Sequence, residues 1–370
     1  MTILNVTTIT EWRGGDAGMY TVYHLLADKA DITQYILCPH DSVLAGKCKK
    51  DGAACFTYKK NALKLINVTK AIIRICKEHG VNVIHAHDSS ALNAGLLAKR
   101  FLPKETTLIF TRKRNNPIKK SPLSRYKYAH PSISRIVCLS DAVAAIFDDV
   151  VKDKSKVQTI YDAVDVEKVA AHRSKGLLRR QLGLSEDTRI VGNVASLTDQ
   201  KDIPTFIETA GLIMDRRGDL PVHFVIIGDG PLRDQMIAYA KEKQVDGVMS
   251  FIGFRDDVLD LLPEFDTLLL TSIVEGLPIT IFEAFACKVP VVATKAGGVA
   301  EAVIHNGTGF VCNIKDTNCL ADHVLDILRS PELAHRLREK GYEKVMNEFN
   351  LPVLKNNYYN FYRSLTNKRL

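Results

Sequence analysis

Two glutamates, eight residues apart in a chain of 370, are the residues best suited to chemistry. Glu275 opens the segment Glu-Gly-Leu-Pro, and Glu283 lies in the apolar run that follows it. Because proline fits the first turn of a helix, we expect Glu275 just before a helix N-terminus and Glu283 about two turns inside. Eight helical residues span about 12 Å. Two carboxylates at this spacing suit the two ends of an extended polar ligand, such as the sugar and ribose of a sugar nucleotide.

The segment from Glu275 to Glu283, with residues 290–294, the pair 297–298 and Glu301, resembles the donor-site signature of retaining glycosyltransferases of family 4. The resemblance implies the α/β class and the GT-B architecture, in which two Rossmann-like domains face each other across a cleft. It also implies that Glu275 lies near the transferred sugar and that Glu283 binds the ribose. An ordinary junction between a loop and a helix is the alternative interpretation. The resemblance further assigns to the donor site the four residues that follow Glu275: Gly276, Leu277, Pro278 and Ile279.

Lys201 lies in the loop 193–202, between an apolar strand and an apolar helix, and this loop resembles the family's pyrophosphate-binding loop. That loop normally supplies an arginine and a lysine. Here Ser196 stands at the arginine position and Asp202 at the usual glycine position. We expect Lys201 to bind phosphate and to act in catalysis with Glu275, whereas Ser196 can donate a hydrogen bond but no charge. An exposed loop lysine is the alternative. The missing cation would have to come from Arg13, Arg233 or the basic residues 112–114.

The other expected donor-side residues follow strands. Gly228 and Gly230 form a Gly-x-Gly turn just before Arg233, and glycine lets a backbone approach a ligand closely. Phe254 would lie beside the nucleotide base, or else pack in the core. Gly14 and Gly15 follow the first strand and would lie near the phosphates, or else form a simple tight turn. The dinucleotide fingerprint Gly-x-Gly-x-x-Gly is missing at that place, which argues against a dehydrogenase.

The acceptor side is expected in the first half of the chain. His85 and His87 lie at the end of a strand, where open α/β sheets bind ligands. Because side chains alternate along a strand, the two histidines share one face. No third metal ligand accompanies them in the sequence. Many relatives have a histidine after the strand 108–111, and this chain has three basic residues instead. The expected acceptor-side residues are Arg13, His87, Asp88, Arg112 and Arg114.

Charge is unevenly distributed: residues 1–200 carry a net +12, and residues 201–350 carry −8. The stretch 112–135 has eight basic residues and no acidic ones. Such a stretch suits a phosphate-bearing acceptor or a peripheral contact with an anionic membrane, and a solvated loop is the alternative. Without a recognised binding motif, nucleic acid is not expected as a partner.

Strand-like and helix-like segments alternate along the chain, which favours parallel, doubly wound sheets. We expect an acceptor-side Rossmann-like domain over 1–165, a nucleotide-sugar domain over 166–345, and a C-terminal helix over 346–370 that packs back on the first domain. The eight cysteines form no Cys-x-x-Cys and are expected to be buried reduced thiols, with metal or disulfide use as the alternative. No run is long and apolar enough to span a membrane, and we expect a cytoplasmic protein, with a peripheral position at the inner membrane face as a second interpretation.

The sequence contains no Asp-x-Asp, the pair with which metal-dependent glycosyltransferases hold a cation, so no metal or other cofactor is expected. We therefore predict that the protein transfers a sugar from a nucleotide diphosphate sugar, with a UDP-sugar favoured, by a retaining and metal-independent mechanism. The expected acceptor is a glycan or a lipid-linked saccharide, as in polysaccharide or lipopolysaccharide biosynthesis. Two alternatives are a sugar-nucleotide 2-epimerase of the same fold and a non-catalytic sugar-nucleotide-binding relative.

Overall fold

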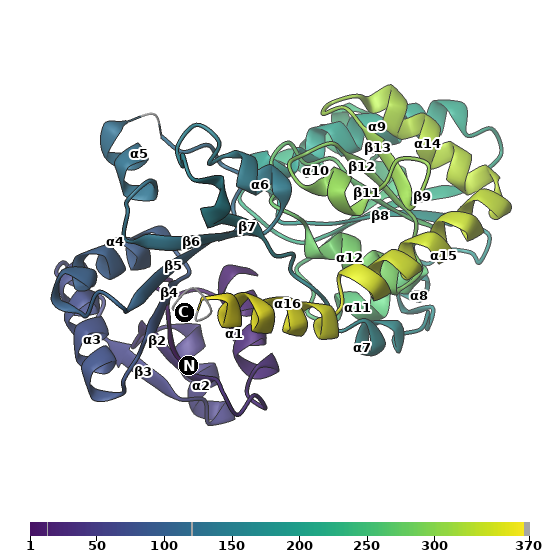
Figure 1. Cartoon of the computed structure of the whole chain (residues 1–370). Coiled ribbons are helices and arrows are strands. Elements are labelled where there is room, and N and C mark those ends of the chain that lie inside the picture. The colour runs from purple at the N-terminus through teal and green to yellow at the C-terminus, as the bar shows by residue number, and fades with distance from the viewer. Residues whose placement is uncertain (13, 120, 366–370) are drawn as a thin grey trace. The chain divides into compact units, whose positions relative to one another are not determined.

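The computed structural model describes residues 1–12, 14–119 and 121–365, and they form two compact units (Figure 1). Unit 1 comprises Met1–Asp162 and residues 354–365, and unit 2 comprises Ala163–Val353. Each unit contains one parallel sheet whose strands alternate with helices, as the α/β prediction requires. Arg13, an expected acceptor-side residue, lies outside the described residues.

Unit 1 is built on a seven-stranded sheet in the order β3-β2-β1-β4-β5-β6-β7. The chain starts in the centre at β1, proceeds outward on one side through β2 and β3, and then returns to β4 on the other side of β1. Ligands of open α/β sheets bind where the strand order reverses in this way, here at the carboxyl ends of β1 and β4. The strands are β1 (Thr2–Val6), β2 (Thr33–Pro39), β3 (Cys55–Tyr58), β4 (Val83–Ala86), β5 (Thr107–Arg112), β6 (Ile133–Cys138) and β7 (Val157–Thr159).

Helices connect these strands, as parallel neighbours require. The longest, α3, packs along α4, and both bury apolar side chains in the core that also receives β1, β4 and β5. The helices are α1 (Gly14–Leu25), α2 (Val43–Asp51), α3 (Lys64–Glu78), α4 (Ser89–Ala98), α5 (Pro122–Tyr128) and α6 (Asp141–Ala145), with short 3-10 turns η1 (Lys99–Phe101) and η2 (Lys154–Lys156).

Unit 2 is built on a six-stranded sheet in the order β10-β9-β8-β11-β12-β13. Its reversal point lies between β8 and β11, which are hydrogen-bonded neighbours. The central strands are mostly apolar because both of their faces are buried. The strands are β8 (Arg189–Val194), β9 (Val222–Ile227), β10 (Met249–Gly253), β11 (Thr267–Leu270), β12 (Val291–Thr294) and β13 (Gly309–Cys312).

The core of unit 2 forms where α9 and α14 pack together over the sheet, with Phe206 and Phe224 edge to face at 6.1 Å. The helices are α7 (Val166–Ala170), α8 (Leu177–Leu182), α9 (Ile203–Arg216), α10 (Arg233–Glu242), α11 (Val258–Leu261), α12 (Ile279–Ala286), α13 (Val299–Ala302), α14 (Thr317–Arg329) and α15 (Pro331–Glu348), with 3-10 turns η3 (Asp199–Lys201), η4 (Asp246–Val248) and η5 (Leu262–Glu264).

The last helix, α16 (Leu351–Ser364), begins in unit 2 and belongs to unit 1 from Leu354 onward. Its Tyr362 is fully buried, and the Tyr362 hydroxyl lies 2.7 Å from Nδ1 of His85 in β4. On the exposed side of the helix, Lys355 pairs with Asp28 at 2.6 Å. A buried hydrogen bond and a surface ion pair thus hold the end of the chain on unit 1.

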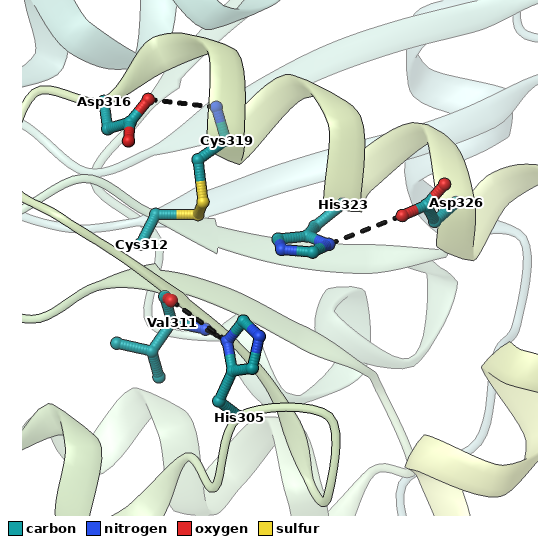
Figure 2. The surroundings of a disulfide bond; sticks show 7 residues. All are labelled: His305, Val311, Cys312, Asp316, Cys319, His323 and Asp326. Carbon is teal, nitrogen blue, oxygen red and sulfur yellow. Dashed lines mark hydrogen bonds and ion pairs between the residues drawn. A yellow bond between two sulfur atoms is a disulfide. The ribbon is translucent and has the colours of Figure 1, made fainter.

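The expectation that the eight cysteines are reduced thiols is wrong for two of them. Cys312, the last residue of β13, and Cys319, in the first turn of α14, form a disulfide (Figure 2). Their Cα atoms are 5.9 Å apart, within the range that a disulfide bridges, because the turn between β13 and α14 folds the helix start back over the strand end. The other six cysteines are free thiols.

Within the described ranges, no helix combines the length and the apolar character that crossing a bilayer requires.

Candidate active site

The reversal point of unit 2 brings together the two loops that the sequence singled out. The loop after β8 carries Lys201, and the loop after β11 carries Glu275. Lys201 Nζ lies 2.5 Å from Glu275 Oε1, and the Ser272 hydroxyl donates to the same oxygen at 2.7 Å. The Lys201 and Glu275 side chains are 24% and 11% exposed. A cation and a carboxylate are thus held at the sheet edge, and both remain accessible to a ligand.

Backbone contacts fix these two loops against each other. Ile273 N donates to Gln200 O at 2.9 Å, and the Thr271 hydroxyl lies 3.0 Å from Asp202 O. The Lys201–Glu275 pair is therefore positioned by the loops themselves and does not depend only on the two flexible side chains. Sequence reasoning missed Thr271 and Ser272, although their place directly after β11 was a signal.

Asp202 stands at the family's usual glycine position and adopts a left-handed backbone conformation, with φ 46° and ψ 53°. Glycine takes this conformation without strain, and aspartate tolerates it better than most residues do. The Asp202 carboxylate accepts a hydrogen bond from the Thr205 hydroxyl at 2.7 Å. This bond helps to offset the strain and preserves the turn that presents Lys201.

Two sequence-predicted residues near the pyrophosphate loop are available to a ligand. Ser196 is exposed, so its hydroxyl can donate to a phosphate. Arg233 begins α10 with a side chain 37% exposed, and its nearest carboxylate, Asp234, is 3.9 Å away. Arg233 is accordingly the cation of unit 2 that could supply the charge missing at Ser196.

Gly228 and Gly230 are required for a reason other than ligand approach. A Cβ on Gly228, whose φ is +141°, would lie 1.9 Å from Ala195 O, and one on Gly230 would lie 2.4 Å from Leu197 O. Leu197 N also donates to Asp229 O at 3.0 Å. The two glycines therefore let the turn after β9 pack against the loop that contains Ser196, and a direct contact with the donor stays a prediction.

Phe254 follows β10 and is 77% exposed, which rules out core packing as its role. The preceding residue, Gly253, accepts a hydrogen bond from Gly228 N at 2.8 Å. An exposed aromatic ring beside the Gly-x-Gly turn has a free face on which a planar base can stack.

Glu283 lies closer to its helix start than expected. Pro278 is the N-cap, α12 begins at Ile279, and Glu283 is therefore its fifth residue, little more than one turn in. Burial raises the pKa of Glu283, and within the described chain its carboxyl group has no hydrogen-bonding or ionic partner. Gly276 O accepts from Gly298 N at 3.0 Å, and Leu277 is buried, so these residues hold the loop shape that presents both glutamates.

In unit 1, Gly14 and Gly15 begin α1 directly after the loop that follows β1. A Cβ on either glycine would meet nothing within 4 Å, and neither has a positive φ. Neither packing nor backbone strain therefore requires glycine there. The start of a twelve-residue helix with open space around it is a place where an anion can approach backbone N–H groups.

The strand ends at β1 and β4 contain a buried polar network. His85 Nε2 lies 2.6 Å from the Thr111 hydroxyl, and the rings of His85 and His87 are 4.0 Å apart, as expected for residues on one face. His87 Nε2 lies 3.0 Å from Asn5 Oδ1. Burial lowers the pKa of His85 to about 3, so that this ring is neutral, and it also lowers the pKa of His87.

Asp88 is used as a structural residue. It caps α4 by accepting from Ser90 N and Ala91 N at 2.8 and 2.9 Å, and it accepts from the Thr8 hydroxyl at 2.8 Å. These bonds join the end of β1 to the start of α4. Asp88 therefore has a structural role in the described chain, and a direct contact with the acceptor stays a prediction.

The three basic residues after β5 differ in their surroundings. Arg112 Nε donates to Arg114 O at 3.0 Å, so the guanidinium of Arg112 is folded onto its own loop. Lys113 Nζ pairs with both oxygens of Asp162 at 2.7 and 2.8 Å, in the space left because Gly18 has no side chain. Arg114 is exposed, and its side chain forms no hydrogen bond or ion pair with any residue that the structure describes. Of the three, Arg114 is thus the cation available to an anionic acceptor.

A pocket of about 470 Å³ lies in unit 1 between α4 and α5, and the basic stretch 112–135 supplies part of its lining. Leu123 and Tyr126 at its rim are 82% and 64% exposed. The pocket is lined by Asn93, Leu96, Leu97, Arg100, Leu123, Ser124, Tyr126, Lys127 and His130. Basic and apolar side chains are mixed here, a combination suited to amphiphilic or anionic groups.

Comparison with known proteins shows the family of the chain. The glycosyl transferases group 1 profile matches residues 174–344, and the glycosyltransferase family 4 profile matches residues 20–168. The chain is 27% identical over 243 residues to N-acetyl-alpha-D-glucosaminyl L-malate synthase of Bacillus anthracis, a match that spans 63% of each chain. It is 25% identical over 301 residues to UDP-Gal:alpha-D-GlcNAc-diphosphoundecaprenol alpha-1,3-galactosyltransferase of Escherichia coli, which covers 78% of each.

Among solved structures, HepE of Anabaena in complex with UDP superposes with a TM-score of 0.85 at 17% identity, covering 98% of this chain and all of that one. This likeness concerns the fold. The family 4 profile lies almost entirely on unit 1, the group 1 profile lies on unit 2, and the donor-side motifs lie within the group 1 match. The chain therefore belongs to the group 1 glycosyltransferases of the GT-B fold.

Proposed function

We propose that the protein transfers a sugar from a UDP-sugar to a glycan or lipid-linked saccharide, with retention of anomeric configuration and without a metal ion. The observation that carries this proposal is the Lys201–Glu275 pair at the reversal point of the unit 2 sheet. It combines a cation for the leaving pyrophosphate with a carboxylate for the sugar, at the edge where open α/β sheets bind ligands.

The remaining donor contacts follow from burial and exposure. Glu283 has no protein partner within the described chain, and two ribose hydroxyls would satisfy its carboxylate oxygens. Phe254 presents an exposed ring to the uracil base. UDP as the nucleotide is supported by the names of relatives: the Escherichia coli enzyme uses UDP-Gal, and HepE was solved with UDP and with UDP-glucose.

The transfer breaks the bond between the anomeric carbon and the pyrophosphate oxygen and forms a bond from that carbon to the acceptor oxygen. In the retaining scheme the acceptor hydroxyl attacks from the face that the leaving group vacates, and its proton passes to the departing pyrophosphate. Lys201 stabilises the negative charge that develops on the pyrophosphate. The Glu275 carboxylate stabilises the positive charge that develops on the sugar ring.

Cationic groups supply the stabilisation that a metal ion supplies in other enzymes. Lys201 offers a full charge, and the first N–H groups of α12 offer partial charges. The sequence contains no Asp-x-Asp to bind a cation on the pyrophosphate. We expect activity to persist in EDTA, and a loss that Mg²⁺ restores would disprove this part of the proposal.

The acceptor is proposed to bind to unit 1 as an anionic glycan or lipid-linked saccharide at the cytoplasmic face of a membrane. The exposed Arg114 and the pocket with Arg100 and Lys127 support an anionic ligand. The Escherichia coli relative takes a diphosphoundecaprenol-linked acceptor. Sedimentation with vesicles tests the membrane part: binding to phosphatidylglycerol vesicles but not to phosphatidylcholine vesicles is expected, and equal binding or none would contradict it.

A panel of nucleotide sugars tests the reaction itself. The protein is incubated with UDP-glucose, UDP-galactose, UDP-N-acetylglucosamine and their GDP counterparts, and nucleotide release and sugar identity are followed. Release of UDP, stimulated by an acceptor, is expected. Conversion of the donor to its 2-epimer without an acceptor would indicate the epimerase instead, and binding without any turnover would indicate a non-catalytic protein.

A further inference from the structure

A second cluster of reactive side chains lies in unit 2 where β13 is followed by α14. Cys312 ends the strand, and Cys319 and His323 stand on the helix. One ligand atom from each of the three lies within 4.8 Å of the other two. Because Cys319 and His323 are four residues apart on a helix, they project from the same helical face, over the end of the strand.

The surroundings of His323 hold its ring in a fixed orientation. The ring stacks flat on Phe310, with centroids 4.0 Å apart and an angle of 4° between the planes. Its Nδ1 lies 3.4 Å from Asp326 Oδ2. Figure 2 shows the ring between Asp326 and the disulfide, with its other nitrogen turned toward the sulfur atoms. Metal-binding histidines usually hydrogen-bond a carboxylate through the second nitrogen; here Asp326 stands beside that nitrogen at ion-pair distance, without a hydrogen bond within the described residues.

We propose that Cys312, Cys319 and His323 form a binding site for a thiophilic divalent cation, Zn²⁺, when the disulfide is reduced. Two thiolates and one imidazole are a common zinc ligand set, and water would fill the fourth position. Cys312 is buried, whereas Cys319 and His323 are half-buried, so a cation can enter from the solvent side.

The exchange between the two states balances chemically. A dithiol reductant donates two electrons and two protons, becomes a disulfide itself, and converts the Cys312–Cys319 bond into two thiols. Binding of Zn²⁺ then releases the two thiol protons. The oxidised pair cannot bind the cation in this way, because each sulfur is committed to the other. Metal binding is therefore restricted to the reduced protein.

Cobalt titration tests the proposal, because Co²⁺ replaces Zn²⁺ and absorbs light with a band that reports thiolate bonds. The full chain is reduced with a phosphine, freed of reductant without air, and titrated. We expect one equivalent of Co²⁺ with the thiolate band and tetrahedral d–d bands, displaced by Zn²⁺, and no such signal from the oxidised chain.

Variants distinguish metal binding at this site from metal binding by the other cysteines. His323→Gln and Cys319→Ser should each weaken binding at least tenfold, whereas Cys287→Ser, which removes a half-buried thiol elsewhere in unit 2, should leave it unchanged. If Cys319→Ser fails to fold, the oxidised chain and His323→Gln still provide the comparison. Equal binding by the oxidised and reduced chains, or unchanged binding by His323→Gln, would overturn the assignment.

Discussion

The substitution Glu275→Gln removes one negative charge from beside Lys201 while keeping an oxygen that accepts from Lys201 and from Ser272. In the proposed site, Lys201 holds the pyrophosphate, so the Glu275 carboxylate and the phosphates are like charges on two sides of one ammonium group. We therefore expect Glu275→Gln to bind UDP more tightly than the unaltered protein does, even though it transfers sugar much more slowly.

The size of this effect follows from the geometry. Glu275 Oε1 lies 2.5 Å from Lys201 Nζ, and a phosphate oxygen would lie about 3 Å from Nζ. Charges about 5 Å apart at an effective dielectric constant of about 20 repel by about 3 kcal/mol. Because the Lys201 side chain is 24% exposed, solvent and salt reduce the repulsion to about 1 kcal/mol. Binding of UDP should then be roughly fivefold tighter.

The rate should change in the opposite direction. Loss of one preorganised charge that stabilises a transition state typically lowers kcat by about 10²- to 10³-fold. Lys201→Met, in contrast, should weaken UDP binding roughly 10- to 100-fold, because it removes a charge-assisted hydrogen bond of about 1.5–3 kcal/mol.

Isothermal titration calorimetry with UDP measures these dissociation constants directly. Lys340→Met, which removes an exposed lysine on α15, is the matched control and should bind like the unaltered protein. If Glu275→Gln weakened UDP binding as strongly as Lys201→Met does, the pyrophosphate would not lie beside this ion pair.

Three further predictions concern stability. Tyr362→Phe leaves the buried Nδ1 of His85 unpaired and should lower the unfolding free energy of unit 1, measured in urea, by about 1–3 kcal/mol. The control Tyr359→Phe, on the more exposed side of α16, should lower it by less than about 0.5 kcal/mol. Burial lowers the pKa of His85 to about 3, so below about pH 6.5 the unfolded chain binds a proton at this side chain that the folded chain does not bind. The unfolding free energy should therefore be full above about pH 6.5 and fall toward about pH 3 by up to about 1.4 kcal/mol per pH unit. His85→Gln should flatten this slope, and an unchanged slope would contradict the assignment. Asp202→Ala should be less stable than Asp202→Gly by about 1 kcal/mol in thermal or urea unfolding. Both variants lose the hydrogen bond from Thr205, but only alanine is strained in the left-handed backbone conformation of this position. Equal stabilities would contradict a strained turn.

The fold could be predicted because parallel strands buried on both faces leave a strong signature. The runs that became β11 and β12 are apolar except for one threonine in each, and a helical stretch separates them. The exact start of α12 was less clear. Proline is compatible with both the N-cap and the first turn, and because Pro278 took the cap, Glu283 lies closer to the helix start than expected.

The contact between Lys201 and Glu275 could not be read from the chain. Each residue was expected at the donor site, but they are 74 residues apart, and their pairing depends on β11 lying next to β8. That adjacency is set by the order of strands in the sheet, which periodicity does not encode. The left-handed Asp202 was indicated more clearly, since a glycine is usual at its position in the family.

Side-chain exposure and local turn geometry account for the other differences. Phe254 was open to two interpretations because a single aromatic residue after a strand fits a core or a surface equally well, and only its 77% exposure decides. Cys312 and Cys319 gave no motif, because their approach depends on the way that α14 starts over the end of β13. Asp88 was predicted as a ligand contact, although an aspartate before a helix is also a typical N-cap.

The most direct test of the central claim, retaining sugar transfer at the Lys201–Glu275 site, is a proton NMR time course. The protein is given a UDP-α-sugar, a saccharide acceptor and EDTA, and the anomeric proton of the first product is observed. We expect UDP release together with an α-linked product, both nearly abolished in Glu275→Gln. A β-linked product, or an α-linked product formed at full rate by Glu275→Gln, would contradict it.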